Sequence, residues 1–281
     1  MDEGAASRNV KAKVRHEAAR LAFLVVLLSA ACTGNAPLPT LSSVAGLQTA
    51  AVLTQAAPPP DYQGAVSFPL IDANLSDQPA WDATVQITFD GTFAAQSSAD
   101  VATGTIEAQI FHDELNSARR VVFHAEGAAF GVTTPRDLEA VRLGNDYYLV
   151  TQGSCGKVTD TPSRQIADLT PSSLLGGVAH ATFTAGSQQE LNGLPTWSYT
   201  FASKDVTVPL VHPAANGTVT IAAGSLWIAP AAKAAARFTL TVNLQNATLL
   251  NAAQAVTGQL RESYTLNTVG VLHNISVPFG C

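Results

Sequence analysis

The amino-acid sequence predicts a mainly β fold of the α+β class: a strongly curved antiparallel sheet, or half-open barrel, of about ten or eleven strands, with one or a few short helices on its concave side. Three observations predict this fold. Apolar and polar residues alternate over many short stretches, which is typical of a sheet with one buried face. Gly, Pro and Asn separate these stretches, as in consecutive hairpins. Charged residues make up only 13% of the chain and Met occurs once, whereas Val and Thr recur in the alternating stretches.

The first half of the predicted sheet begins between Thr84 and Asp90. There Val85, Ile87 and Phe89 fall on one face and polar side chains on the other. Because side chains of a strand alternate between its two faces, this pattern predicts one buried face. The same alternation, and the turn sequence Gly144-Asn145-Asp146, predict further strands at 105–111, 119–126, 141–143 and 147–150.

The middle of the chain interrupts the strand pattern between Pro162 and Val178. Thr170 before Pro171 is a suitable helix N-cap, and Gly176-Gly177 is a suitable helix end. The sequence therefore predicts one short helix here, packed over the sheet.

The second half of the sheet is organised around Asn192-Gly193, the strongest short signal for a hairpin turn. The return strand places Trp197, Tyr199 and Phe201 on one face. The final hairpin is expected to turn at Gly270. Strands are predicted at 181–191, 197–201, 218–228, 236–244, 256–266 and 271–277.

The N-terminal segment has the features of an export signal. Five basic residues, four of them between Lys11 and Arg20, precede the apolar run Leu21–Leu28, which is too short for a permanent membrane span. The run ends in Leu28-Ser29-Ala30-Ala31-Cys32, which resembles a bacterial lipobox. The resemblance implies that residues 1–31 are a lipoprotein signal peptide and that Cys32 carries acyl chains of the palmitate kind. The alternative is an ordinary signal peptide, or a signal anchor, with an incidental Cys.

A lipid anchor at Cys32 would place the protein outside the cytoplasm, on the cell membrane or, in a cell with two membranes, on the outer membrane. Residues 32–60 are rich in Ala, Pro, Ser and Thr and lack charge, so a flexible linker is predicted there. A single β-rich domain is predicted over 61–281.

Charge excludes one class of partner. Removal of residues 1–31 takes away 5 of the 15 basic and 3 of the 21 acidic side chains, which leaves a formal net charge near −8. An acidic surface repels phosphate backbones, so no nucleic-acid partner is expected.

Two cysteines remain in the predicted domain, Cys155 and Cys281. An oxidising compartment favours a disulfide between them. The alternative is two buried free thiols. No metal site is expected, because the histidines outside the signal segment have no partner at ligand spacing. They are predicted to be surface residues: His112, His124, His180, His212 and His273.

Three sequence motifs occur in a fixed order behind the lipobox. They are Glu190–Thr196, with its Asn-Gly turn, then Gly224–Ala229, then Ala236–Leu240. Over about residues 81–277 the chain resembles carriers and lipoproteins of the LolA/LolB superfamily, and most nearly the LppX/LprG-type lipoproteins. The resemblance implies a half-barrel of about eleven strands, plugged by helices, with a cavity that holds acyl chains.

The wall of such a cavity can be assigned from strand alternation. The side chains on the predicted inner face are apolar: Trp197, Tyr199, Phe201, Leu226, Ile228, Phe238 and Leu240. The alternative is that these side chains form ordinary core between sheet and helix.

Two function classes follow. The first is a membrane-anchored extracytoplasmic lipoprotein that binds or carries a lipid or other hydrophobic ligand without catalysis. The second is an envelope lipoprotein that acts as a structural or protein-interaction module. An enzyme is not expected: the sequence contains no recognisable catalytic or cofactor motif and no Gly-x-Ser-x-Gly sequence, and Asp113-Glu114 is predicted to be a turn.

Overall fold

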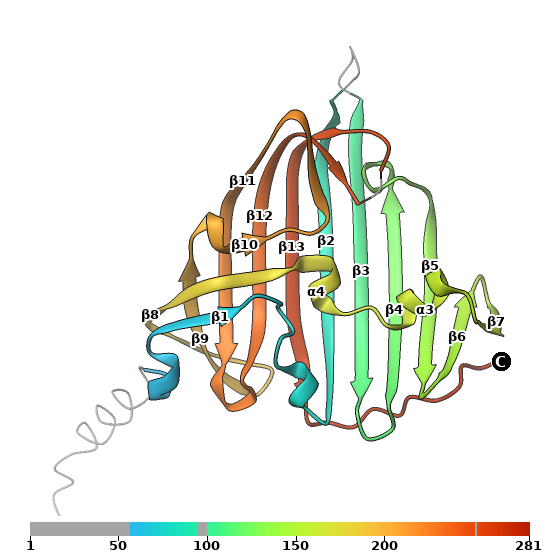
Figure 1. Ribbon diagram of the computed structural model, residues 1–281, viewed down its shortest axis with the longest axis horizontal. Helices are drawn as coiled ribbons and strands as arrows, with labels where there is room; N and C mark the ends of the chain where they lie inside the picture. The colour runs from blue at the N-terminus through green and yellow to red at the C-terminus, as the bar shows by residue number, and fades with distance from the viewer. Residues whose placement is uncertain (1–56, 95–99, 251) are drawn as a thin grey trace, which may run out of the picture. The chain divides into compact units, whose positions relative to one another are not determined.

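The structure is a computed structural model and describes residues 57–94, 100–250 and 252–281 (Figure 1). The predicted signal peptide, Cys32 and most of the predicted linker lie outside these residues. Within the described ranges, no helix is both long and apolar enough to cross a bilayer.

One antiparallel sheet contains the thirteen strands of the described residues, in the order β1-β8-β9-β11-β12-β13-β2-β3-β4-β5-β6-β7, with β10 paired to β8. This confirms the predicted fold class. The structure has more strands than the predicted ten or eleven, because β1, β7 and β10 are too short to show an alternating pattern in the sequence. The strands are β1 (Ala65–Phe68), β2 (Ala80–Phe93), β3 (Val101–Asp113), β4 (Ala118–Gly127), β5 (Val132–Leu143), β6 (Asp146–Thr151), β7 (Ser154–Lys157), β8 (Gly177–Leu191), β9 (Leu194–Phe201), β10 (Val206–Thr207), β11 (Val211–Ala229), β12 (Ala234–Leu249) and β13 (Val256–Val269).

Two short α-helices, α3 (Thr161–Ala167) and α4 (Pro171–Leu175), lie between β7 and β8 where one helix was predicted. They are separate because Thr170 precedes a proline and is extended, with φ −122° and ψ 156°. Thr170 is the N-cap of α4, as predicted, and forms a capping box with Ser173. The 3₁₀ helices are η1 (Pro60–Tyr62), η2 (Leu75–Asp77), η3 (Ala128–Phe130), η4 (Ser203–Asp205) and η5 (Pro230–Ala232).

The sheet curls over itself, so that β1, β8, β10 and α4 cross in front of its longest strands (Figure 1). Helix α4 contacts β2 and β13. We call the covered side of the sheet its inner face. The core lies on this face, because the alternating apolar residues of each long strand, such as Val85 and Ile87 of β2, are fully buried there.

The predicted Asn-Gly hairpin is confirmed. Asn192 and Gly193 connect β8 and β9 with φ angles of +51° and +78°, which the type I′ turn of a two-residue hairpin requires. The Asn192 side chain also donates a hydrogen bond of 2.8 Å to the carbonyl oxygen of Leu266. The turn is thereby joined to β13.

The last predicted strand, 271–277, was wrong. The chain turns at Gly270 (φ +74°) and continues without strand structure to Cys281. Its apolar residues are exposed: Val271 is 54% and Val277 46% exposed. A strand cannot form beside β13 because β12 and β2 already pair with both of its edges.

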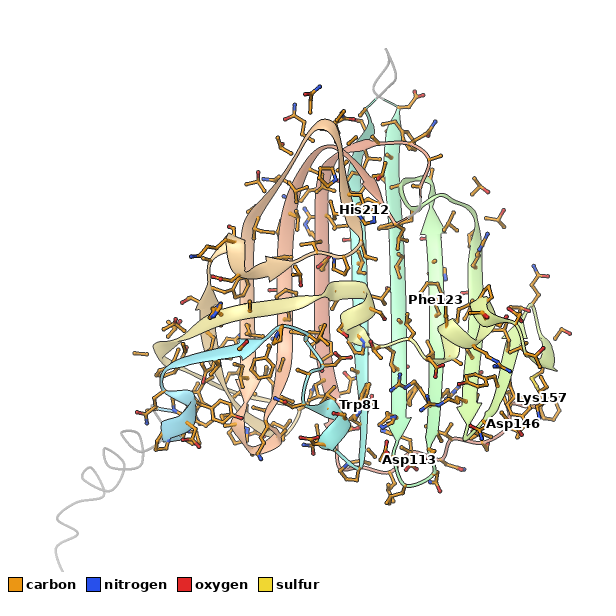
Figure 2. All side chains as sticks on the ribbon, viewed as in Figure 1. Trp81, Asp113, Phe123, Asp146, Lys157 and His212 are labelled. Atoms are coloured by element: carbon orange, nitrogen blue, oxygen red, sulfur yellow. A yellow bond between two sulfur atoms is a disulfide. The ribbon has the colours of Figure 1, made fainter. Side chains whose placement is uncertain are left out.

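The C-terminal segment instead runs to the edge of the sheet formed by β7, where Cys281 forms a disulfide with Cys155 (Figure 1). The two Cα atoms are 5.0 Å apart and the residues are separated by 126 positions. The predicted disulfide is confirmed. Edge strand β7 is held further by an ion pair of 2.7 Å between Lys157 and Asp146 of β6 (Figure 2).

Candidate functional site

The seven side chains of the predicted cavity wall come together on the inner face. Strand register places Tyr199 opposite Leu226 and Leu226 opposite Phe238, and it pairs Trp197 with Ile228. The rings of Phe201 and Phe238 are 6.0 Å apart. A Cβ atom on Gly224, opposite Leu240, would lie 2.5 Å from the Phe201 ring, so only glycine leaves room for that ring.

These side chains are part of the close-packed core. Leu226, Ile228 and Phe238 are completely buried, whereas Phe201 is half-buried. The Tyr199 hydroxyl donates a hydrogen bond of 2.6 Å to the carbonyl oxygen of Tyr62, which attaches η1 to the inner face. Burial raises the pKa of Tyr199 to about 12. That the seven side chains of the predicted wall bind a ligand stays a prediction.

An apolar hollow of about 510 Å³ opens on the inner face beside this wall, between β10 and β11. Val219 and Ile221 of β11 form its floor, since they pair with the inward-facing Leu244 and Val242 of β12. Val206 and Val208 form the opposite side, and Lys204 also lines the hollow. The volume and lining are those of a small-molecule pocket.

Two polar side chains interrupt the apolar inner face. Glu262 of β13 is paired in register with Leu240 and Ile87, and Tyr264 is paired with Phe238 and Val85. Both are almost completely buried, and neither the carboxylate oxygens nor the Tyr264 hydroxyl has a hydrogen-bond partner within the described residues. Burial raises the pKa of Glu262 to about 8 and raises that of Tyr264 as well.

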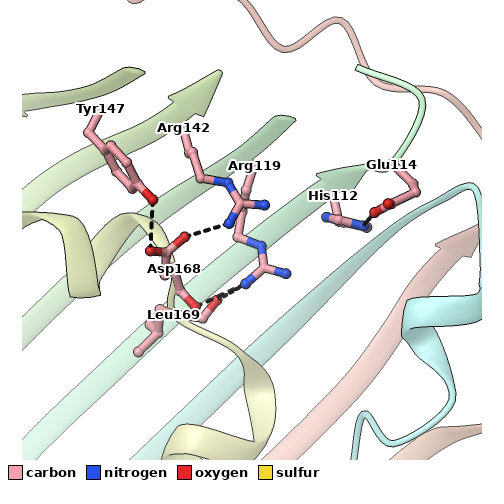
Figure 3. Close-up of polar contacts among 7 residues, drawn as sticks. All are labelled: His112, Glu114, Arg119, Arg142, Tyr147, Asp168 and Leu169. Atoms are coloured by element: carbon pink, nitrogen blue, oxygen red, sulfur yellow. Dashed lines mark hydrogen bonds and ion pairs between the residues drawn. The ribbon is translucent and has the colours of Figure 1, made fainter. Parts of the chain in front are cut away.

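A row of polar and aromatic side chains crosses five strands at the other end of the inner face. Register pairs Trp81 of β2 with His112, His112 with Arg119, Arg119 with Arg142, and Arg142 with Tyr147 of β6. Residues paired in register share one face of the sheet. We call these five residues the polar row, and Figure 3 shows four of them together with the segment after α3.

Hydrogen bonds connect the polar row to the start of the α3–α4 connection (Figure 3). Arg142 donates from Nη1 to the Asp168 carboxylate at 2.7 Å, and Tyr147 donates its hydroxyl to the same carboxylate at 3.2 Å. Arg119 donates from Nη1 to the carbonyl oxygens of Asp168 and Leu169, at 2.9 and 3.3 Å. Arg142 therefore has an anionic partner, while Arg119 has only neutral ones within 4 Å among the described residues.

His112 corrects the prediction that the histidines are surface residues, because it is only 5% exposed. Its Nε2 lies 3.1 Å from Oε2 of Glu114. Burial, followed by the nearby charge of Arg119, lowers the pKa of His112, so the imidazole is neutral at pH 7. The predicted turn begins at Glu114, whereas Asp113 is the last residue of β3 and accepts a hydrogen bond from the Asn116 backbone N–H at 3.3 Å. In the described part of the chain, no group of three or more His, Cys, Asp or Glu is arranged to hold a metal ion.

Comparisons with known proteins give distant similarities of structure. No family model matches the sequence, and no match was found among curated proteins. The chain is similar to LprF from Mycobacterium bovis, with a TM-score of 0.35 and 14% identity over 80% of this chain and 99% of that one. It is also similar to a LolA superfamily protein from Nitrosomonas europaea, with a TM-score of 0.21 and 8% identity over 73% of this chain and 94% of that one.

Sequence reasoning missed Glu262 and the polar row. A signal was present, because each of these residues occupies the phase of its strand that is otherwise apolar. Arg119, for example, has the same parity as the inward-facing Val121 and Phe123. A charged residue in an apolar phase indicates a buried polar group that requires a partner.

Proposed function

We propose that this chain is a membrane-anchored extracytoplasmic lipoprotein that binds or carries a lipid or other hydrophobic ligand at the cell envelope, without a catalytic step. The observation that carries the proposal is the apolar hollow between β10 and β11, which opens on the concave side of an unclosed sheet. An acyl chain can enter such a hollow without breaking a backbone hydrogen bond.

Two features support the location outside the cytoplasm. The lipobox-like sequence ending at Cys32 supplies an acyl acceptor behind a short apolar run. The disulfide between Cys155 and Cys281 belongs to an oxidising compartment. In this proposal residues 1–31 are removed, 32–60 form the linker to the membrane and 61–281 form the binding domain.

The binding proposal is tested on the full chain purified from membranes. Organic extraction followed by mass spectrometry should detect lipid in the wild-type protein. Val219→Trp should remove most of that lipid, because the larger ring occupies the hollow. Val122→Trp is the matched control, since Val122 and Val219 are both 37% exposed and Val122 lies on the outer face of β4.

Lipid that is absent from wild-type protein, or that remains bound to Val219→Trp at the wild-type level, would contradict the proposal. Absence of lipid together with a protein that co-purifies in fixed ratio would favour the alternative, a structural or protein-interaction module.

Anchoring is tested separately with Cys32→Ser. This variant lacks the acyl acceptor, so we expect it to stay uncleaved or to be released, and to carry no acyl chain. Metabolic labelling with a fatty acid, followed by detergent phase separation, measures this. A Cys32→Ser protein that still incorporates label would show that the anchor lies elsewhere.

A further inference from the structure

We propose that the polar row forms a second binding site, distinct from the apolar hollow, which takes a ligand bearing a single carboxylate group. The site is a hollow of about 430 Å³ in front of β2–β5, lined by Trp81, His112, Arg119 and Arg142 of the row. The two hollows share no lining residue. Trp81 lines the second hollow, and His212 is flanked in the sequence by Val211 and Pro213, which line the first; these two labelled residues lie at different levels of the sheet (Figure 2).

Unpaired hydrogen-bond donors point to an acceptor-rich ligand. Nε1 of Trp81 and the Nε atoms of Arg119 and Arg142 are covered and have no partner among the described residues. Within the described residues, the hydrogen bonds of both guanidinium groups come from Nη1 alone. Buried donors are ordinarily paired, so three unpaired donors beside one hollow are unusual. Protein atoms cover all three, so a ligand in the hollow reaches them only after the surrounding side chains shift.

Arg119 is the residue best placed to hold an anion. Its guanidinium lies over the Trp81 ring, 6.0 Å from the ring centre, a position that allows a cation–π interaction. It has no carboxylate partner within 4 Å in the described residues, whereas Arg142 is neutralised by Asp168. A carboxylate can accept two parallel hydrogen bonds from one guanidinium group, and such charge-assisted pairs are strong.

The charges around the hollow select for a single negative charge. Asp72 and Glu114 also line it and would repel a doubly charged phosphate. His112 adds no positive charge. Because the Glu114 carboxylate can only accept, the neutral imidazole donates from Nε2 and presents Nδ1 as an acceptor.

The remaining lining combines apolar residues with the hydroxyl groups of Ser76, Thr170 and Ser172, and its apolar part fits a ligand that carries a hydrocarbon portion. Leu75 is buried beneath the hollow, and Leu70, which is 52% exposed, lies at its rim. The carboxylate can therefore belong to an amphiphile or to a small free acid, and the two sources are separable by experiment.

The test uses titration calorimetry on the detergent-purified full chain with three probes: hexanoate, its neutral analogue hexanamide, and acetate. We expect hexanoate to bind and hexanamide not to bind measurably. Acetate as tight as hexanoate would assign the site to small free acids, whereas acetate about tenfold weaker would assign it to ligands with a hydrocarbon portion.

Variants identify the site. Arg119→Met should weaken hexanoate binding about tenfold or more, through loss of a charge-assisted pair. Arg120→Met is the matched control, because Arg120 is the next residue of β4, faces the opposite side and pairs with Glu139 at 2.7 Å. Asp72→Asn should strengthen binding by roughly two- to fivefold through loss of a repelling charge. This variant keeps the test valid if Arg119→Met fails to fold.

Three results would overturn the proposal: equal binding of hexanoate and hexanamide, equal effects of Arg119→Met and Arg120→Met, or no binding of any probe. Val219→Trp should leave hexanoate binding unchanged. Failure of the lipid proposal and failure of this one are therefore distinguishable.

Discussion

Glu262 shows at the scale of a single residue how the inner face departs from a simple apolar core. Its carboxyl group lies between Leu240 and Ile87 and has no hydrogen-bond donor within the described residues. A buried carboxylate without a partner is costly, so the folded chain holds this group in its protonated form, and its pKa rises to about 8.

The raised pKa predicts that stability falls as pH rises. Between the ordinary value of 4.5 and about 8, the folded chain keeps a proton on Glu262 that the unfolded chain has released. The free energy of unfolding should therefore decrease through this window, by about 1.4 kcal/mol for each pH unit at most, and level off above it. Chemical denaturation at several pH values measures the slope.

Glu262→Gln provides the comparison, since the amide has nearly the same shape and no charge to lose. We expect its free energy of unfolding to vary less between pH 5 and pH 8 than that of the wild type, and to exceed it above pH 8. Identical pH profiles for the two proteins would mean that Glu262 is not the group responsible.

At the scale of an element, α4 illustrates how a very short helix is held in place. The Thr170 hydroxyl accepts a hydrogen bond from the Ser173 backbone N–H, and the Ser173 hydroxyl lies 3.1 Å from the Thr170 backbone N–H. Leu174 and Leu175 are buried against the sheet. A five-residue helix is unstable by itself in water, so its cap and its packing must stabilise it.

Thr170→Ala should therefore lower the free energy of unfolding by about 1 kcal/mol, the usual effect of losing an N-cap. Faster hydrogen exchange of the Ser173 and Gly176 amides should accompany the loss, because the amide of Gly176 bonds within α4. Thr133→Ala, at an exposed position of β5, is the control and should change neither measurement. An unaltered exchange rate in Thr170→Ala would show that packing alone holds α4.

At the scale of the whole described domain, the C-terminal segment joins the two halves of the sheet. It leaves β13, the central strand beside β2, and ends at edge strand β7 through the disulfide (Figure 1). Buried Asp82 of β2 holds the end of β13, from which the segment leaves, since it accepts hydrogen bonds from Asn267 and Thr268. His273 lies 3.5 Å from the same carboxylate.

Loss of the disulfide should destabilise the protein strongly. For a loop of 126 residues, the chain-entropy model gives about 5 kcal/mol. Cys155→Ser combined with Cys281→Ser should lower the midpoint of thermal unfolding and make residues near Cys281 accessible to carboxypeptidase first.

Thiol titration of unfolded, non-reduced wild-type protein should find neither the Cys155 nor the Cys281 thiol free. Two titratable thiols in protein from its native compartment would contradict the pairing.

The amino-acid sequence by itself determined the class of fold and much of its local structure. Alternation such as that of Val85, Ile87 and Phe89 indicated which face of each strand is buried, because strand geometry is a property of the backbone alone. Local chemistry likewise indicated the Asn192-Gly193 turn and the Thr170 cap. The predicted disulfide followed from the only two cysteines of the domain.

Only the tertiary structure decided which strands are neighbours. Val271–Val277 has a strand-like pattern but finds no free edge, since β13 is already paired on both sides. The polar row brings together Trp81, Arg119 and Tyr147 from distant parts of the chain, in a register that no local pattern specifies. Cross-strand contact depends on strand order and register, and both are set by the packing of the whole sheet.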